Sequence, residues 1–333
     1  MAHRVTLIAG DGIGPEVTQA TRRVIEAAGV SIAWDECEAG EAVYQRDGEA
    51  LPPATVESIR RNRVALKGPI ATPSGTGYRS VNVRLRQMLD LFANVRPARS
   101  IAGLPARYDN VDLIVVRENT EGLYSGLEHE VVPGVVESLR VITRQASQRV
   151  VRFAFEIAQR HGRKLVTAVH KANILKKSDG LFLNVAREVA AEFPQIKYNE
   201  CIVDAAAMKL VMDPHQFDVL VMENLFGDIL SDLTSGLVGG LGLTPSANIG
   251  DRFAVFEAVH GTAPDIARQG FANPTAVLLS GVLLLRHVGE ITAADRIENA
   301  VRQVLSQGRH TTRDLGGTAT TDQYVDAVIA ALG

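Results

Sequence analysis

The sequence predicts an α/β protein with a mainly parallel sheet. Strand-like and helix-like segments alternate almost throughout the chain, as they do in such folds. A length of 333 residues suits about two domains, and a hydrophobic content of 46% supports large cores. No internal repeat or low-complexity linker divides the chain. Breaks rich in Gly and Pro at 97–105 and 236–245 are compatible with one domain from the middle segment and one from both chain ends.

The elements can be predicted in order along the chain. A buried strand at 5–9 is broken by the glycine loop 10–14, after which Pro15 suits the first turn of a helix through about residue 28. Further strands are expected at 64–67, 113–116, 165–169, 202–203 and 219–222. Further helices are expected at 82–92, 146–160, 181–192, 224–237, 274–288, 293–306 and 322–332.

Composition argues against several classes of partner. The net charge of −3 gives no support for nucleic acid as a partner. No apolar run approaches the ~20 residues of a membrane span, so no membrane association is expected. The chain enters its first strand directly, without a visible signal peptide, and Cys37 and Cys201 lack the spacing of a disulfide framework. We therefore expect a cytoplasmic protein, with a removed transit peptide left open.

The glycine loop at 10–14 invites comparison with dinucleotide-binding loops. It follows a strand and opens a helix, but its spacing is G-x-G-x-G, whereas the dinucleotide fingerprint needs its third glycine one residue later. A tight strand-to-helix turn near a cleft is the favoured interpretation. A Rossmann fold is therefore not expected.

Asp228 and Asp232 form the clearest local pattern. They lie four residues apart in a predicted helix, so their carboxylates share one face. Two such charges converge best around a divalent cation, and oxygen ligands favour Mg²⁺ or Mn²⁺. By spacing alone a solvated acidic face is equally compatible. Asp204, directly after the predicted strand 202–203, is a candidate third ligand or a plain turn residue.

Arg86, Arg96 and Arg117 form a candidate anion site. They are placed at the ends of predicted elements, beside loops, where binding sites usually form. Guanidinium groups bind carboxylates through paired hydrogen bonds, so arginines converging in one cleft would suit a di- or tricarboxylic acid. Any single arginine is more often a surface charge, which is the interpretation favoured for Arg84.

Two further groups could contribute chemistry. Lys171, after a predicted strand, could serve as a base, and the Tyr124 hydroxyl could deliver a proton. In the loop 257–266, Gly261 allows close approach of a ligand, and Asp265 could accept hydrogen bonds from ribose hydroxyls. A carboxylate there disfavours a 2′-phosphate and so favours NAD. Each of these residues alone also suits a structural role.

Taken together, these segments resemble the isocitrate/isopropylmalate dehydrogenase family nearly end to end. The matching motifs are 10–16, 90–97, 117–124, 170–173, 224–232 and 260–265. The resemblance implies a two-domain α/β fold that is not Rossmann, with the active-site cleft between the domains. Residues 1–98 and 239–333 would form the large, cofactor-binding domain, and 99–238 the small domain with the metal site and dimer interface. A homodimer or higher homo-oligomer with shared active sites is expected.

The resemblance also implies roles for individual residues. Asp228 and Asp232 resemble metal ligands of one subunit, while Lys171 and Asp204 resemble those contributed by the other. Tyr124 and Lys171 would be catalytic, and the substrate would be bound by Ser80, Asn82, Arg86, Arg96 and Arg117. The cofactor would be bound by Thr72, Asn173, His260, Gly261, Thr262, Ala263, Asp265, Ile266 and Asn273.

The implied activity is the NAD-dependent oxidative decarboxylation of isocitrate to 2-oxoglutarate and CO₂ with Mg²⁺ or Mn²⁺. Ser80 and Asn82 can hydrogen-bond a distal carboxylate, whereas an isopropyl tail would leave them unpaired at a cost of about 1–3 kcal/mol. Homoisocitrate is the first alternative and 3-isopropylmalate the second, and a non-catalytic regulatory subunit is the alternative from another class. Similar NADP enzymes have a Lys-Tyr pair where this chain has Asp265 and Ile266, which favours NAD here. Arg313 lies in a nearby segment of the family, so residual use of NADP is left open.

Overall fold

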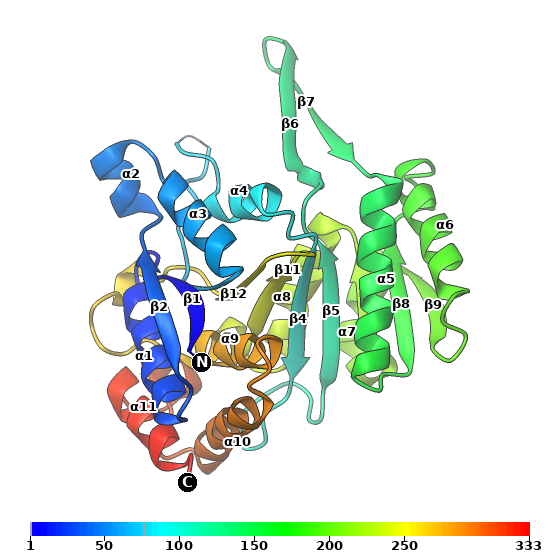
Figure 1. The fold of residues 1–333 in the computed structure, drawn as a ribbon. Helices are drawn as coiled ribbons and strands as arrows, with labels where there is room; N and C mark the ends of the chain where they lie inside the picture. The colour runs from blue at the N-terminus through cyan, green and yellow to red at the C-terminus, as the bar shows by residue number, and fades with distance from the viewer. Residues whose placement is uncertain (1, 76) are drawn as a thin grey trace.

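The computed structural model describes residues 2–75 and 77–333. A ten-stranded sheet runs through the molecule in the order β2-β1-β3-β12-β11-β4-β5-β10-β8-β9, with a separate two-stranded sheet β6-β7 (Figure 1). The strands are β1 (His3–Ile8), β2 (Ile32–Cys37), β3 (Val64–Lys67), β4 (Ala93–Arg99), β5 (Asp112–Glu118), β6 (Gly122–Val132), β7 (Val135–Val141), β8 (Leu165–His170), β9 (Lys197–Ile202), β10 (Val219–Met222), β11 (Pro245–Ile249) and β12 (Ala254–Ala258). The helices are α1 (Gly14–Ala27), α2 (Glu41–Asp47), α3 (Pro53–Asn62), α4 (Val81–Met88), α5 (Arg144–Arg160), α6 (Ser178–Ala190), α7 (Val203–Met212), α8 (Asn224–Leu237), α9 (Thr275–His287), α10 (Ile291–Gln307) and α11 (Thr321–Ala330).

The sheet is parallel at both sides and antiparallel in the middle. β2, β1, β3 and β12 pair in parallel, as do β5, β10, β8 and β9. The pairs β12-β11, β11-β4 and β4-β5 are antiparallel. The expected α/β class with mainly parallel pairing is therefore confirmed, and the antiparallel centre was not predicted.

Helices predicted from apolar periodicity are confirmed to within a few residues, and one strand prediction needs correction. The strand expected at 202–203 is β9, which ends at Ile202, and Val203 begins α7. Asp204 therefore lies in the first turn of a helix and does not end a strand. Local patterns also failed to predict β2, α2, α3, β4, β6, β7, α7, β11 and β12.

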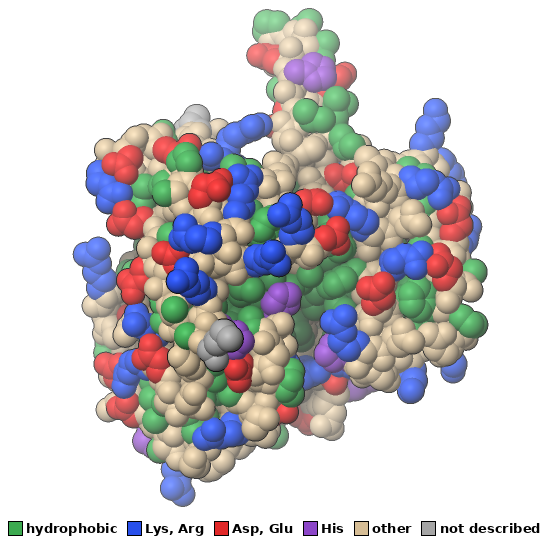
Figure 2. Space-filling view, in the orientation of Figure 1, with side chains coloured by type: hydrophobic (Ala, Val, Ile, Leu, Met, Phe, Trp, Pro, Cys, Tyr) green, Lys and Arg blue, Asp and Glu red, His purple; other side chains and the backbone are tan. Residues whose placement is uncertain are grey.

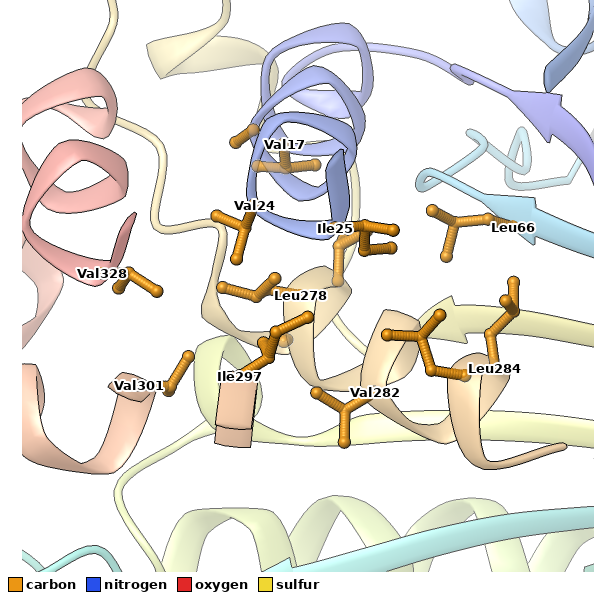
Figure 3. Packing of buried hydrophobic residues seen from close by; sticks show 14 of the residues in the cluster. Val17, Val24, Ile25, Leu66, Leu278, Val282, Leu284, Ile297, Val301 and Val328 are labelled. Carbon is orange, nitrogen blue, oxygen red and sulfur yellow. The ribbon is translucent and has the colours of Figure 1, made fainter. Parts of the chain in front are cut away.

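One hydrophobic core joins the two ends of the chain. It lies among α1, α9, α10, α11 and the strands beside them, as Figure 3 shows for residues from sequence positions as distant as Val17 and Val328. Both side chains are fully buried. Burial of this kind is worth about 1.5–3 kcal/mol for each large aliphatic side chain.

The middle of the chain has cores of its own. One lies between α5, α6 and the strands β5, β8 and β10, and a second lies between the other face of these strands and α7 and α8. This separation supports our proposal of a large domain from 1–98 and 239–333 and a small domain from 99–238. The two cysteines, Cys37 and Cys201, are free thiols.

The β6-β7 hairpin projects from the body of the molecule (Figure 1), and hydrophobic side chains lie along it (Figure 2). Val131, Val132, Val135 and Val136 are about half exposed or more. Isolated hairpins are marginally stable in water, so this arm is suited to packing against another surface. Among the described residues, no helix is long and apolar enough to cross a bilayer.

Candidate active site

The site forms where β5, β10 and α8 meet. β10 pairs in parallel with β5, with Met222 opposite Arg117, and α8 begins two residues later at Asn224. Arg117 donates to the Asn224 side-chain oxygen at 3.0 Å from Nε and 2.7 Å from Nη2. Gly227 allows this approach, because a Cβ there would lie 2.5 Å from Arg117 Cγ. The register of two strands therefore sets Arg117 against the first turns of α8.

Asp228 is the centre of a polar cluster. One carboxylate oxygen accepts hydrogen bonds from Arg117 and, at 3.5 Å, from Arg96, and the other accepts from the Tyr124 hydroxyl. Burial opposes its ionisation, but Arg117, Tyr124 and Arg96 together lower the pKa of Asp228 below its ordinary value. Burial and Asp228 raise the pKa of Tyr124. Tyr124 is therefore held as a neutral proton donor against an ionised carboxylate.

Asp232 lies on the same face of α8, as the spacing predicted. Arg96 Nη1 donates to it at 3.1 Å, but 52% of its side chain is exposed. Burial raises the pKa of Asp232, and neighbouring Asp228 adds to the rise, so Arg96 does not fully compensate. A further cation beside Asp228 and Asp232 would relieve this repulsion.

The arginines expected to bind substrate converge. Arg86, Arg96 and Arg117 all lie buried around one cavity, with 1% of Arg117 exposed. Burial, followed by repulsion from Arg86 and Arg96, lowers the pKa of Arg117 to about 9. An anion entering this cavity would offset that cost.

Two buried residues that the sequence analysis missed support Arg86. Lys67 and Glu257 form an ion pair at 2.6 Å, and Arg86 Nη2 lies 3.5 Å from the same carboxylate. Burial alone would raise the pKa of Glu257, but Lys67 and then Arg86 lower it to about 2. Lys67 also donates to the backbone oxygen of Gly68 at 2.9 Å. Glu257 thus fixes the two cations in place at the cavity wall.

The cavity among these residues, together with its opening to solvent, has a volume of about 710 Å³. Its lining includes Ser80, Asn82, Arg86, Arg96, Arg117, Tyr124, Asp228 and His260. Within the described residues, three buried polar atoms of this lining have no hydrogen-bond partner: Asn82 Oδ1, Arg86 Nε and His260 Nε2. Buried polar atoms are normally paired, so these atoms indicate where a polar ligand binds. Ser80 caps α4 by accepting from Val83 N–H at 3.4 Å.

A second, larger cavity of about 1220 Å³ adjoins the first, since His260 and Gly261 line both. Of the predicted cofactor residues, Ala263, Ile266 and Asn273 also line it. The sequence analysis missed Ile13, Gly242, Phe271 and Asp314, which complete the wall with Arg313. Arg313 stacks on Phe271 with 3.5 Å from guanidinium carbon to ring centre, and Asp314 accepts from Asn273 at 2.9 Å.

The glycine loop at 10–14 packs against the backbone of Thr262, next to the residues that line this second cavity. Gly12 has φ +58°, and a Cβ there would lie 2.0 Å from the Thr262 backbone oxygen. Ile13 N–H donates to that same oxygen at 2.9 Å. Thr262 is therefore held through its backbone, which agrees with the interpretation of this loop as a tight turn near a cleft. Thr72 and Asp265 line neither cavity: Thr72 donates to Ser80, which lines the first, at 3.2 Å, and Asp265 is exposed.

Lys171, Asp204 and Asn173 lie outside the cluster around Asp228. Lys171 pairs with Asp204, and 68% of the Asp204 side chain is exposed. Asn173 is exposed two residues after Lys171 and lines neither cavity. One chain therefore carries two separate groups: Asp228 with its arginines and Tyr124, and the Lys171–Asp204 pair.

The residues present fit a divalent cation in part. Asp228 and Asp232 offer hard oxygen ligands on one helix face, as Mg²⁺ and Mn²⁺ prefer. In residues 2–75 and 77–333, no three acidic, His or Cys side chains lie close enough to complete a metal site. The remaining ligands would have to come from a substrate or a second chain.

Comparisons with known proteins agree with this geometry. The family model described as isocitrate/isopropylmalate dehydrogenase matches residues 4–328. The mitochondrial NAD isocitrate dehydrogenase catalytic subunit 5 of Arabidopsis thaliana is 56% identical over 97% of this chain and 87% of its own length. The chloroplastic 3-isopropylmalate dehydrogenase of Solanum tuberosum is 56% identical over 92% of this chain and 86% of its own length.

The fold agrees as well. The crystal structure of isocitrate dehydrogenase from Methylococcus capsulatus superposes with a TM-score of 0.97 at 54% identity, covering 99% of each chain. Together, the family model over nearly the full length, the relatives above 50% identity and the shared architecture decide the assignment. The chain belongs to the isocitrate/isopropylmalate dehydrogenase family.

Proposed function

We propose that this chain catalyses the NAD-dependent oxidative decarboxylation of isocitrate to 2-oxoglutarate and CO₂. The observation that carries the proposal is the cavity in which Arg86, Arg96 and Arg117 converge beside unpaired polar atoms. Such a wall suits a substrate with several carboxylates. The names of the Arabidopsis and Methylococcus relatives support the same activity.

Specificity for the distal group of the substrate would depend on the first turn of α4. Ser80 and Asn82 line the cavity, where the Ser80 hydroxyl and the Asn82 amide nitrogen are the groups able to donate to a ligand. A distal carboxylate can accept from the Ser80 hydroxyl and the Asn82 amide, whereas an isopropyl group would leave both unpaired. That loss costs about 1–3 kcal/mol and so favours isocitrate over 3-isopropylmalate.

Proton transfer would be divided between two chains. The partner's Lys171 would accept the substrate hydroxyl proton during hydride transfer, and Tyr124 would donate a proton to carbon after CO₂ leaves. The hydrogen bond from Tyr124 to Asp228 orients this donor. Arg86, Arg96 and Arg117 would hold the carboxylates that do not react.

Two bound groups would supply the remaining chemistry. A divalent cation held by Asp228, Asp232 and the partner's Asp204 would act as a Lewis acid toward the substrate oxygens. NAD in the larger cavity would accept the hydride. The cavity lined by His260, Gly261 and Asn273 adjoins the substrate cavity, as hydride transfer requires.

A homodimer or a higher oligomer would complete each site. Beside Lys171 and Asp204 the surface carries exposed Ile174, Met208 and Met212, and Ile229 is 56% exposed between the two aspartates of α8. Together with the apolar hairpin, this surface is suited to burial against a second chain. The Arabidopsis relative is named a catalytic subunit, which favours assemblies of more than one kind of chain as the alternative.

The remaining alternatives are distinguishable. Homoisocitrate is one methylene longer than isocitrate, a difference worth only about 1–3 kcal/mol in a pocket. The Solanum relative keeps 3-isopropylmalate as a candidate. A regulatory subunit is disfavoured, because Asp204, Asp228, Asp232, Lys171 and Tyr124 are all present. The cytoplasmic location remains a prediction, and the name of the Arabidopsis relative places that protein in mitochondria.

The decisive experiment offers isocitrate, homoisocitrate and 3-isopropylmalate to the purified chain with Mg²⁺ or Mn²⁺, and follows reduction of NAD and NADP. We expect the highest kcat/KM with isocitrate and NAD, and no turnover after complete removal of metal by chelation. Turnover with 3-isopropylmalate alone would contradict the role of Ser80 and Asn82. Absence of NADH formation with every substrate would support the regulatory alternative.

A further inference from the structure

Arg140 is a buried cation between two buried carboxylates. It lies in β7 at the base of the hairpin, and only 14% of its side chain is exposed. Its Nη1 donates to Asp179, and its Nη2 forms an ion pair with Glu223 at 3.3 Å without the geometry of a hydrogen bond. Its guanidinium carbon lies 5.1 Å from the ring centre of Phe226. The planar fork of arginine is suited to holding two carboxylates at a fixed separation.

Asp179 connects Arg140 to Lys171. It lies in the first turn of α6 with 2% of its side chain exposed. One carboxylate oxygen accepts from Arg140, and the other accepts from the backbone N–H of Lys171 at 2.5 Å. The position of the Lys171 backbone therefore depends on the Arg140–Asp179 pair.

Glu223 connects Arg140 to α8. It is the N-cap of that helix, and 4% of its side chain is exposed. Its two oxygens accept from the N–H groups of Phe226 at 3.0 Å and Leu225 at 3.2 Å. The first turn of α8, which leads directly into Asp228, is thus anchored to the same guanidinium group.

We propose that Arg140 is a positioning residue that sets both contributions of one chain to catalysis: α8 in its own site and Lys171 in the partner's site. This inference rests on the shared active sites of the proposed function. Without the guanidinium group, Asp179 and Glu223 would be left as buried charges without their shared cation. The Lys171 loop and the start of α8 would then shift independently, and a displacement of about 1 Å in a reacting group can cost about a hundredfold in rate.

Mixed dimers separate the two effects. A dimer of one Lys171→Met chain and one Asp228→Asn chain has a single competent site, which uses α8 of the first chain and Lys171 of the second. We expect Arg140→Met in the first chain to raise the metal concentration for half-maximal rate about tenfold. In the second chain, we expect the same change to lower kcat about a hundredfold at an unchanged metal requirement.

The controls distinguish positioning from general loss of structure. Arg144 lies four residues after Arg140 and forms an exposed ion pair with Glu188. Arg144→Met removes this pair and should leave both the metal requirement and kcat unchanged in either chain. Arg140→Lys keeps the charge, and we expect it to restore at least part of each loss and to preserve folding if Arg140→Met does not. The proposal would be overturned if Arg140→Met had no effect in one of the two chains. It would also be overturned if the variant changed the metal requirement and kcat in the same way whichever chain carried it. Absence of activity in the reference mixed dimer would instead show that the sites are not shared.

Discussion

The two functional groups of this chain are built in opposite ways. The group around Asp228 is buried, with Arg117 almost fully enclosed and each carboxylate of the cavity wall paired with cations. The Lys171–Asp204 pair is more open on its acidic side: 68% of the Asp204 side chain is exposed, against 28% for Lys171 and 36% for Asp228, and exposed apolar side chains lie beside it. The arginines buried around Asp228 can bind a ligand within one chain. The Lys171–Asp204 pair, called the open pair, lines neither cavity of the isolated chain. The difference is compatible with our proposal that the open pair acts in the site of a partner chain.

The largest expected effect is on the open pair. Lys171→Met should lower kcat by about 10²–10⁴-fold, because it removes a proton-transfer group. The thermal midpoint should change little, because Met has about the length of Lys and keeps the apolar contacts of this side chain, 28% of which is exposed. Lys176→Met, an exposed lysine in the same loop, is the matched control and should retain full activity. A Lys171→Met protein with normal kcat would remove the open pair from the reaction.

Glu257, in the buried group, should make the free energy of unfolding depend on pH. The folded-state pKa of Glu257 is lowered to about 2, so its stabilisation is present above the unfolded pKa of about 4.5 and is lost as the pH falls toward 2. Each pKa unit is worth about 1.4 kcal/mol, which gives about 3 kcal/mol for Glu257. Urea unfolding from pH 7 to pH 2 should therefore show a difference between wild type and Glu257→Gln that shrinks to nothing with acid.

The exposed Glu57→Gln variant provides the comparison for that experiment, because Glu57 pairs only at the surface with Arg60. Its difference from wild type should be small at every pH. A Glu257→Gln curve parallel to the wild-type curve would contradict the buried ion group.

Tyr124 lies in the buried group but is expected to act late in the reaction. Hydride transfer would leave a 2-oxo tricarboxylate, and Tyr124→Phe should slow its conversion to 2-oxoglutarate about a hundredfold, because the carbon that loses CO₂ then lacks its proton donor. Reduction of the same intermediate by NADH should fall much less. Tyr44→Phe, which alters a partly exposed tyrosine in α2, serves as control. Equal losses in both half-reactions would assign Tyr124 to orientation instead.

The smallest effect is on substrate binding. Arg86→Met should raise the KM for isocitrate about thirtyfold, corresponding to about 2 kcal/mol for a charge-assisted hydrogen bond. Arg84 lies two residues earlier on α4 and pairs with Glu49 outside the cavity, so Arg84→Met should leave KM unchanged. Similar KM values for the two variants would show that the arginine cluster does not bind the substrate.

Local patterns predicted much of this molecule. The spacing of Asp228 and Asp232 placed both on one face of α8, and Pro15 marked the beginning of α1 to within one residue. The convergence of Arg86, Arg96 and Arg117 was predicted from element ends together with the family resemblance, and the geometry agrees.

Long-range pairing explains what local patterns missed. Lys67 ends a short apolar strand that reads as core, and its partner Glu257 lies 190 residues later in a strand that was not predicted. The hairpin was missed because its valines are exposed, whereas hydrophobic patterning assumes that such residues face a core. Arg140 was missed for a related reason, since Asp179 and Glu223 come together only through tertiary packing.

The exposed valines of the β6-β7 hairpin would also make activity depend on protein concentration. In the proposed assembly a second chain would cover these valines, so mass action would govern how many complete sites exist. Dilution should therefore act as a reversible inhibitor, with specific activity falling steeply below the dissociation constant of the assembly.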